Sequence, residues 1–242
     1  MEKDRKDAIV HTMNPDCQKG PILFAFLQRD IHRPNKAESR HRLISVLWDH
    51  LVAMKRPPGK RCQFADEMAS PIQIGCDRLG RPLLLVGKYR GPAISFSEGD
   101  GKVWAALCGD ASDIGIDVAG TDEFGEGYPC HRVFHPQEIQ HASRVTGGDL
   151  KNASALLWSI KEAVVKALGC AFHLVDPLQM TVNPSASGAR GGSGYTFPVD
   201  LSGKALMRFP MAADRPLWVH SLPQEKMWLS IALLNQRPTD HE

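Results

Sequence analysis

The strongest constraint on the fold is the segment 156–169, LLWSIKEAVVKALG, which has the pattern of a helix with almost no polar face. Ten of the fourteen residues in 155–168 are apolar, so the pattern predicts a helix that is buried on nearly all sides. Asn152 or Ser154 is the expected N-cap, and Gly169 is the expected end. The charged residues inside such a helix require an explanation.

Three charges interrupt this segment, and they have two possible interpretations. Glu162 and Lys166 are four residues apart and share a helix face, so one interpretation is an exposed salt bridge worth a few tenths of a kcal/mol. Asp117 ends the apolar strand IGIDV, where a charge is costly unless it is paired or bound to metal. Asp117 and Glu162 together fit Mg²⁺, and Lys161 and Lys166 would meet the phosphates of a substrate. The pattern favours a magnesium–diphosphate site.

Shorter patterns predict the remaining elements. Strands are expected at 22–30, 83–86, 93–97, 102–108, 113–120, 217–222 and 226–234, and helices at 35–55 and 135–144. Asn35 is the expected cap of the first helix, segment 56–60 its end, and the Gly/Ser-rich segment 185–194 a surface loop. Strand 22–30 with helix 35–55 has the same plan as strand 114–122 with helix 154–169. This repetition predicts two similar α+β halves, with a boundary near residue 110 and a groove between them.

Composition argues against several classes of protein. A net charge of +2 over 242 residues does not indicate a nucleic-acid partner, and no apolar run approaches the roughly 20 residues that span a bilayer. The six cysteines include no CxxC pair, and the charged N-terminal segment lacks the apolar centre of a signal peptide. Residues 1–61 carry 13 basic and 7 acidic residues, which fits a solvated basic face, an anion site or an acidic partner. We expect a cytoplasmic protein with no nucleic-acid or membrane partner.

Five motifs occur in an order and at a spacing that resemble a known family. They are GRP at 80–82, SFS at 95–97, IGID at 114–117, VFHPQE at 133–138 and WSIKEAVVKALG at 158–169. Together they resemble the 4'-phosphopantetheinyl transferase superfamily, in particular its large pseudo-dimeric, surfactin-synthetase-activating type. The combination of GID with WxxKEAxxK carries the resemblance, which extends from about residue 80 to 170.

The resemblance implies an activity and a fold. Such enzymes transfer the phosphopantetheine group of coenzyme A to a serine of an apo acyl or peptidyl carrier protein. They require Mg²⁺ and release adenosine 3',5'-bisphosphate. The implied enzyme is of the holo-[acyl-carrier-protein] synthase type, serving fatty-acid, polyketide or nonribosomal-peptide biosynthesis. The implied fold is a monomer of two α+β halves related by a pseudo-twofold axis, each a long helix on a small antiparallel sheet. Residues 1–110 would form the 3'-phosphate and adenine side, and residues 111–242 the magnesium and catalytic side.

The resemblance also assigns roles in the catalytic half. Asp117 and Glu162 are the implied magnesium ligands, and Glu162 is also the implied base that deprotonates the carrier serine. Lys161 and Lys166 are the implied catalytic clamps that bind the diphosphate of coenzyme A. Glu138 closes a motif typical of the family. Its role stays open between a structural hydrogen bond and a function in the site.

Four residues of the N-terminal half are implied to bind coenzyme A. Arg40 is the candidate for the 3'-phosphate, with Arg42 as the other choice. Arg81, in the GRP motif, is expected at the adenine end. Ser97 corresponds to the serine of the family segment NxSH.

The sequence departs from the family pattern at two positions. Ala119 stands where many relatives have a third carboxylate, and Glu98 stands where relatives have the histidine of NxSH. We expect water to fill the metal position at 119, and Glu98 to turn toward solvent or toward Arg40 or Arg42.

Two alternative functions stay open: a carrier-binding homologue with impaired catalysis, and another Mg-dependent enzyme that cleaves diphosphates. The sequence does not say which carrier protein is served.

Overall fold

The computed structural model describes residues 8–13, 21–28, 35–55, 70–109, 113–125, 127–185, 194–214 and 217–234. It divides into two compact units, Met1–Asp113 and Ile114–Glu242. The segment 56–60, expected to end the first helix, and most of the expected loop 185–194 lie outside the described residues.

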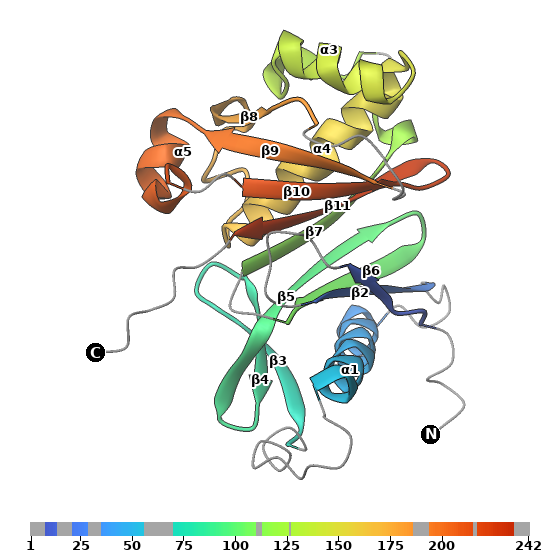
Figure 1. Ribbon diagram of the computed structural model, residues 1–242, viewed down its shortest axis with the longest axis vertical. Coiled ribbons are helices and arrows are strands. Elements are labelled where there is room, and N and C mark those ends of the chain that lie inside the picture. Colours follow the sequence, from blue (N-terminus) through green and yellow to red (C-terminus); the bar gives the residue numbers. More distant parts are fainter. Residues whose placement is uncertain are drawn as a thin grey trace. The chain divides into compact units, whose positions relative to one another are not determined.

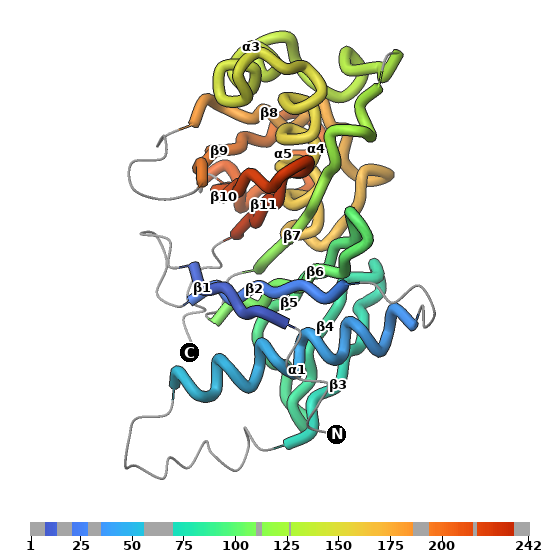
Figure 2. Tube along the Cα trace, turned by 90° about the vertical axis from the view of Figure 1, so that its right-hand side faces the viewer, coloured from blue at the N-terminus to red at the C-terminus, as the bar shows by residue number. Residues whose placement is uncertain are grey.

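The N-terminal unit is a long helix packed on an antiparallel sheet (Figures 1 and 2). The order of the strands across the sheet is β1 (His11–Met13), β2 (Ile22–Gln28), β6 (Lys102–Cys108), β5 (Tyr89–Gly99), β4 (Pro82–Val86) and β3 (Ile72–Cys76). Helix α1 (Lys36–Lys55) begins after Asn35, whose Oδ1 accepts from the Glu38 amide at 3.3 Å, as expected of its cap. It buries Leu43, Ile44, Leu47, Trp48, Leu51 and Val52. This helical spacing explains its single apolar face.

The C-terminal unit repeats this plan around helix α4 (Leu150–Ala167). Its sheet has the order β7 (Asp113–Gly120), β11 (Met227–Leu234), β10 (Leu217–Pro223), β9 (Tyr195–Leu201) and β8 (Met180–Val182). Helices α3 (Pro136–Val145) and α5 (Gly203–Arg208) complete the unit, and α3 packs on α4 (Figure 1). Short 3₁₀ turns lie at Thr121–Glu123 (η2), Cys130–Arg132 (η3), Pro177–Gln179 (η4) and Pro210–Ala212 (η5).

The two sheets have the same connectivity. In each unit the first long strand, β2 or β7, is followed by the long helix and lies next to the last strand, β6 or β11. The remaining strands then run back in reverse chain order, as hairpin connections produce. The predicted α+β fold of two similar halves is therefore confirmed, with β1 as an addition to the N-terminal sheet.

Helix α4 differs from its prediction at one end and agrees at the other. It starts at Leu150 rather than near residue 154, and its cap is Asp149, not Asn152 or Ser154. The Asp149 carboxylate accepts from the amides of Lys151 at 2.9 Å and Asn152 at 3.4 Å. At the other end, Gly169 has φ +72 and its amide bonds to the Lys166 carbonyl, while the Cys170 amide bonds to the Val165 carbonyl. These two bonds form a Schellman motif, so the predicted end is confirmed.

Candidate active site

The candidate site is built on the close packing of strand β7 against helix α4. Gly115 lies against the helix backbone, where a Cβ atom would collide with the carbonyl group of Ala163 and the amide nitrogen of Ala167. Only glycine permits so close an approach. Because side chains alternate along a strand, Asp117 and Ala119 share the Gly115 face and point toward the same helix.

Asp117 and Lys166 form an ion pair across this packing. The Lys166 ammonium donates to Oδ1 of Asp117 at 2.6 Å and to the carbonyl oxygen of Ile116 at 3.1 Å. The Asp117 side chain is 8% exposed and the Lys166 side chain 27%. The acid is therefore shielded from water, while the lysine keeps access to solvent.

Glu162 lies one turn before Lys166 on α4 and is half-buried. Burial, the charge of Asp117 and the charge of Glu123 together raise its pKa to about 7, while the charge of Lys166 opposes the rise. A carboxyl group with a pKa near neutrality gains and loses its proton readily at physiological pH. This property suits a general base.

Asp117 and Glu162 fit a divalent cation. The charge of Asp117 disfavours ionisation of Glu162, and a cation bound by both would remove that conflict. Mg²⁺ binds through one or two carboxylates and completes its coordination with water and substrate oxygens. Among the described residues no group of three or more His, Cys, Asp or Glu side chains is arranged to hold a metal. Asp117 and Glu162 could hold a cation together, and both their role as metal ligands and magnesium itself stay predictions.

The position of the missing third carboxylate is buried. Ala119 is 1% exposed and packs in the apolar core of the C-terminal unit. Four residues further, Oε1 of Glu123 accepts from the Gly120 amide at 2.8 Å, and its charge raises the pKa of Glu162. Burial and the charges of Cys130, Glu123 and Glu162 raise the pKa of Tyr128. The sequence analysis missed Glu123 and Tyr128, and the acidic turn directly after β7 was the available signal for the first.

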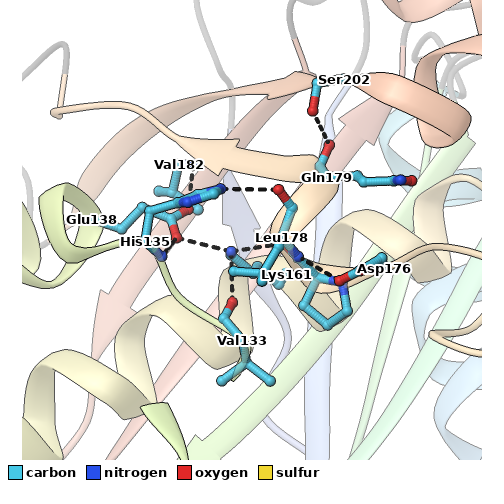
Figure 3. Close-up of polar contacts among 10 residues, drawn as sticks. Val133, His135, Glu138, Lys161, Asp176, Leu178, Gln179, Val182 and Ser202 are labelled. Atoms are coloured by element: carbon cyan, nitrogen blue, oxygen red, sulfur yellow. Dashed lines mark hydrogen bonds and ion pairs between the residues drawn. The ribbon is translucent and has the colours of Figure 1, made fainter. Parts of the chain in front are cut away.

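Lys161 does not belong to this cluster, and the structure does not support its predicted role as a diphosphate clamp. Its side chain is fully buried, and its ammonium donates to Oε2 of Glu138 and to the carbonyl oxygens of Val133 and Pro177, each at 2.9 Å (Figure 3). These three bonds use every proton of the ammonium group. Residues one position apart on a helix point about 100° apart, so Lys161 faces away from Asp117 although Glu162 follows it directly.

Glu138 has a structural role, one of the two that the sequence left open. Its two oxygens accept from Lys161, from the His135 amide at 2.6 Å and from the Val182 amide at 2.7 Å. It therefore joins the start of α3 to strand β8 and to helix α4 (Figure 3). The neighbouring aromatic residue Trp158 packs against Phe134 and Phe172, which identifies it as a core residue.

Arg40 is held by Glu98 in the N-terminal unit. Nη2 of Arg40 lies 3.3 Å from Oε1 of Glu98, and the Lys36 ammonium lies 2.8 Å from Oε2. The predicted turn of Glu98 toward a basic side chain is therefore confirmed for Arg40. Arg42 lies on the same helix and is half-buried. Lys36 was not predicted, although its spacing of four from Arg40 was a usable signal.

Ser97 and Arg81 are not brought together with Arg40. Phe96 packs in the core beneath α1. Side chains alternate along β5, so Ser97 lies on the opposite face of the sheet from Arg40 and α1. Arg81 forms an ion pair with Asp113, and both side chains are largely buried. The predicted roles of Ser97 in binding coenzyme A and of Arg81 at the adenine end stay predictions.

The fold and the cluster define an α+β protein whose acids and lysine suit divalent-cation and phosphate chemistry. Residues 113–200 match the family model described as the 4'-phosphopantetheinyl transferase superfamily. The matched residues are thus similar to the superfamily that the motifs resemble, and they make up 88 of the 242 residues. The large pseudo-dimeric subtype stays a prediction.

Comparison with solved structures gives a distant likeness. The chain is similar to the Chronobacterium ammoiniagenes apo-ACPS structure, with 20% identity, a TM-score of 0.40, and coverage of 51% of this chain and 95% of that chain. No residue role is transferred from a likeness of this size. None of the curated proteins matches. Within the described ranges, no helix is long and apolar enough to cross a membrane.

Proposed function

We propose that the chain transfers the 4'-phosphopantetheine group of coenzyme A to a serine of an apo carrier protein, releasing adenosine 3',5'-bisphosphate. The observation that carries the proposal is the cluster of Asp117, Glu162 and Lys166, which lies inside the segment that matches the superfamily. Activity of the holo-[acyl-carrier-protein] synthase type and service to fatty-acid, polyketide or peptide biosynthesis are part of the same proposal.

Glu162 acts as the base in this proposal. With its pKa raised to about 7 by burial, its carboxylate accepts a proton from the carrier serine hydroxyl more readily than an ordinary glutamate does. The serine oxygen then attacks the β-phosphorus, the phosphoanhydride bond breaks, and the leaving phosphate oxygen keeps the electron pair. Asp117 and Glu162 would hold Mg²⁺, which when bound would neutralise charge on the diphosphate.

In this proposal Lys166 pairs with Asp117 in the free protein and with the leaving phosphate during the reaction. In the structure its ammonium neutralises Asp117 at 2.6 Å. With a cation bound to that carboxylate, Lys166 would be available to the leaving phosphate, since its side chain already reaches solvent. Lys161 contributes no charge to the diphosphate, because it is buried against Glu138.

The test is transfer to a purified apo carrier protein. The chain is incubated with coenzyme A, Mg²⁺ and the carrier, and the carrier is weighed by mass spectrometry. We expect a mass gain equal to one phosphopantetheine group with the wild type. The Glu162→Gln variant should lose at least about 10²-fold in kcat/KM, the usual order for a general base. Diphosphate cleavage without a carrier, or carrier binding without a mass gain, would each contradict the proposal.

A further inference from the structure

Glu98 occupies a position between two cations of helix α1. Its Oε2 lies 2.8 Å from the Lys36 ammonium, and its Oε1 lies 3.3 Å from Nη2 of Arg40. Lys36 and Arg40 are one helical turn apart, so both side chains project from one face of α1 toward the end of β5. One carboxylate thus bridges two cations, in the way that a bound anion would.

Arg40 is oriented but its hydrogen bonding is incomplete. Its guanidinium lies over the ring of Phe96, with 5.2 Å between the central carbon and the ring centroid. Its Nε is buried and has no hydrogen-bond partner among the described residues. Stacking on an aromatic ring fixes the plane of a guanidinium, and a phosphate offers enough acceptor oxygens to use several of its donors at once. The two oxygens of Glu98 leave that capacity partly unused.

We propose that Glu98 is an internal competitor of a phosphate group for Lys36 and Arg40, so that the chain discriminates weakly between coenzyme A and a donor without the 3'-phosphate. The inference rests on the proposed function for the identity of the donor. A 3'-phosphate must displace the carboxylate before it gains both cations, or else approach a like charge. Either route weakens the contribution of the 3'-phosphate to binding.

The chain offers a matched control for this idea. Asp100 lies two residues after Glu98, its side chain is 64% exposed, and its carboxylate contacts Lys102 at 3.3 Å rather than α1. Its φ of +51 suits asparagine as well as aspartate. The variants Glu98→Gln and Asp100→Asn therefore remove the same charge from one hairpin, but only the first releases Lys36 and Arg40.

The first test is calorimetric binding of adenosine 3',5'-bisphosphate and of adenosine 5'-phosphate. We expect Glu98→Gln to raise the affinity for the bisphosphate by roughly tenfold, while the affinity for the monophosphate changes by less than about twofold. Asp100→Asn should change neither by more than about twofold, because its charge is exposed and screened. Adding Arg40→Ala to Glu98→Gln should remove the gain.

Three results would overturn the inference: an equal gain in Asp100→Asn, an equal gain for both nucleotides, or no detectable binding of the bisphosphate to Glu98→Gln. The second test compares transfer rates with coenzyme A and dephospho-coenzyme A. The ratio of the two kcat/KM values should be small in the wild type and roughly tenfold larger in Glu98→Gln. If neither donor supports transfer, the proposed function fails, while the binding comparison still decides the role of Glu98.

Discussion

At the scale of single residues, the raised pKa of Glu162 links the candidate chemistry to stability. Burial and the charge of Asp117 raise its pKa from 4.5 to about 7, so the folded chain holds a proton that the unfolded chain releases between these values. In that window the stability of the metal-free protein falls as pH rises. Ionised Glu162 therefore costs folding stability in this window, and binding a cation would recover the loss.

The first prediction follows from this fall in stability with rising pH. In the absence of metal, Glu162→Gln should be more stable than the wild type at pH 8 by on the order of 1 to 3 kcal/mol, and the difference should vanish near pH 4.5. Urea unfolding across this range in a chelating buffer measures it. Mg²⁺ should then stabilise the wild type more than the variant. A difference that is constant with pH would contradict the raised pKa.

The second prediction concerns the buried pair of Lys161 and Glu138. Replacing one partner, by Lys161→Met or Glu138→Gln, leaves the other buried without its counter-charge, so each should lose about 3 to 5 kcal/mol. The double variant should lose clearly less than the sum. Lys151→Met, at an exposed lysine of the same helix, is the control and should stay within about 0.5 kcal/mol. If Lys161→Met unfolds like the control but has lost transfer activity, Lys161 binds substrate after all.

At the scale of elements, the sequence patterns predicted α1, α3 and α4 and the strands β2, β4, β5, β6, β7, β10 and β11. They missed the strands β1, β3, β8 and β9 and the short helix α5. β3 and β8 are short and lie at sheet edges, and β9 contains Pro198, which is unusual inside a strand. The contacts made by each face of helix α4 were harder to predict than the helix itself. Sequence spacing placed Glu162 and Lys166 on one face, but it could not show that Lys161 faces a carboxylate 23 residues upstream.

The third prediction belongs to the contact between β7 and α4. Gly115→Ala should destabilise the C-terminal unit by about 1 to 3 kcal/mol or more, since the added methyl group meets rigid helix backbone. Gly125→Ala is the matched control, because a Cβ there has no neighbour within 4 Å and should cost little. Thermal unfolding of both variants checks this. An unchanged Gly115→Ala melting temperature would mean that β7 does not lie so close to α4.

At the scale of the whole molecule, the repeated sheet order explains which parts of the site a sequence can predict. The plan of strand, helix and returning hairpins was visible from two apolar segments, because it depends on order alone. The positions of Ser97 and Arg81 depend on the face of a strand and on a distant ion pair, which spacing does not encode. The motifs that resemble the superfamily therefore combine residues in unlike surroundings, such as the fully buried Lys161 beside the half-buried Glu162.

The fourth prediction uses the distribution of charge over the chain. Residues 1–61 carry 13 basic and 7 acidic residues, whereas the remainder carries 16 and 20. Carrier proteins are expected to be acidic around their serine, so association with this basic region should be partly electrostatic. The KM for the carrier should rise as the screening length falls from about 30 Å at 0.01 M salt to about 8 Å at 0.15 M. Since screening acts on encounter, kcat should change far less than KM, and an equal osmolality of sucrose should leave KM unchanged. A KM that stays flat with salt, or that rises equally with sucrose, would show that the carrier is recognised without the basic region.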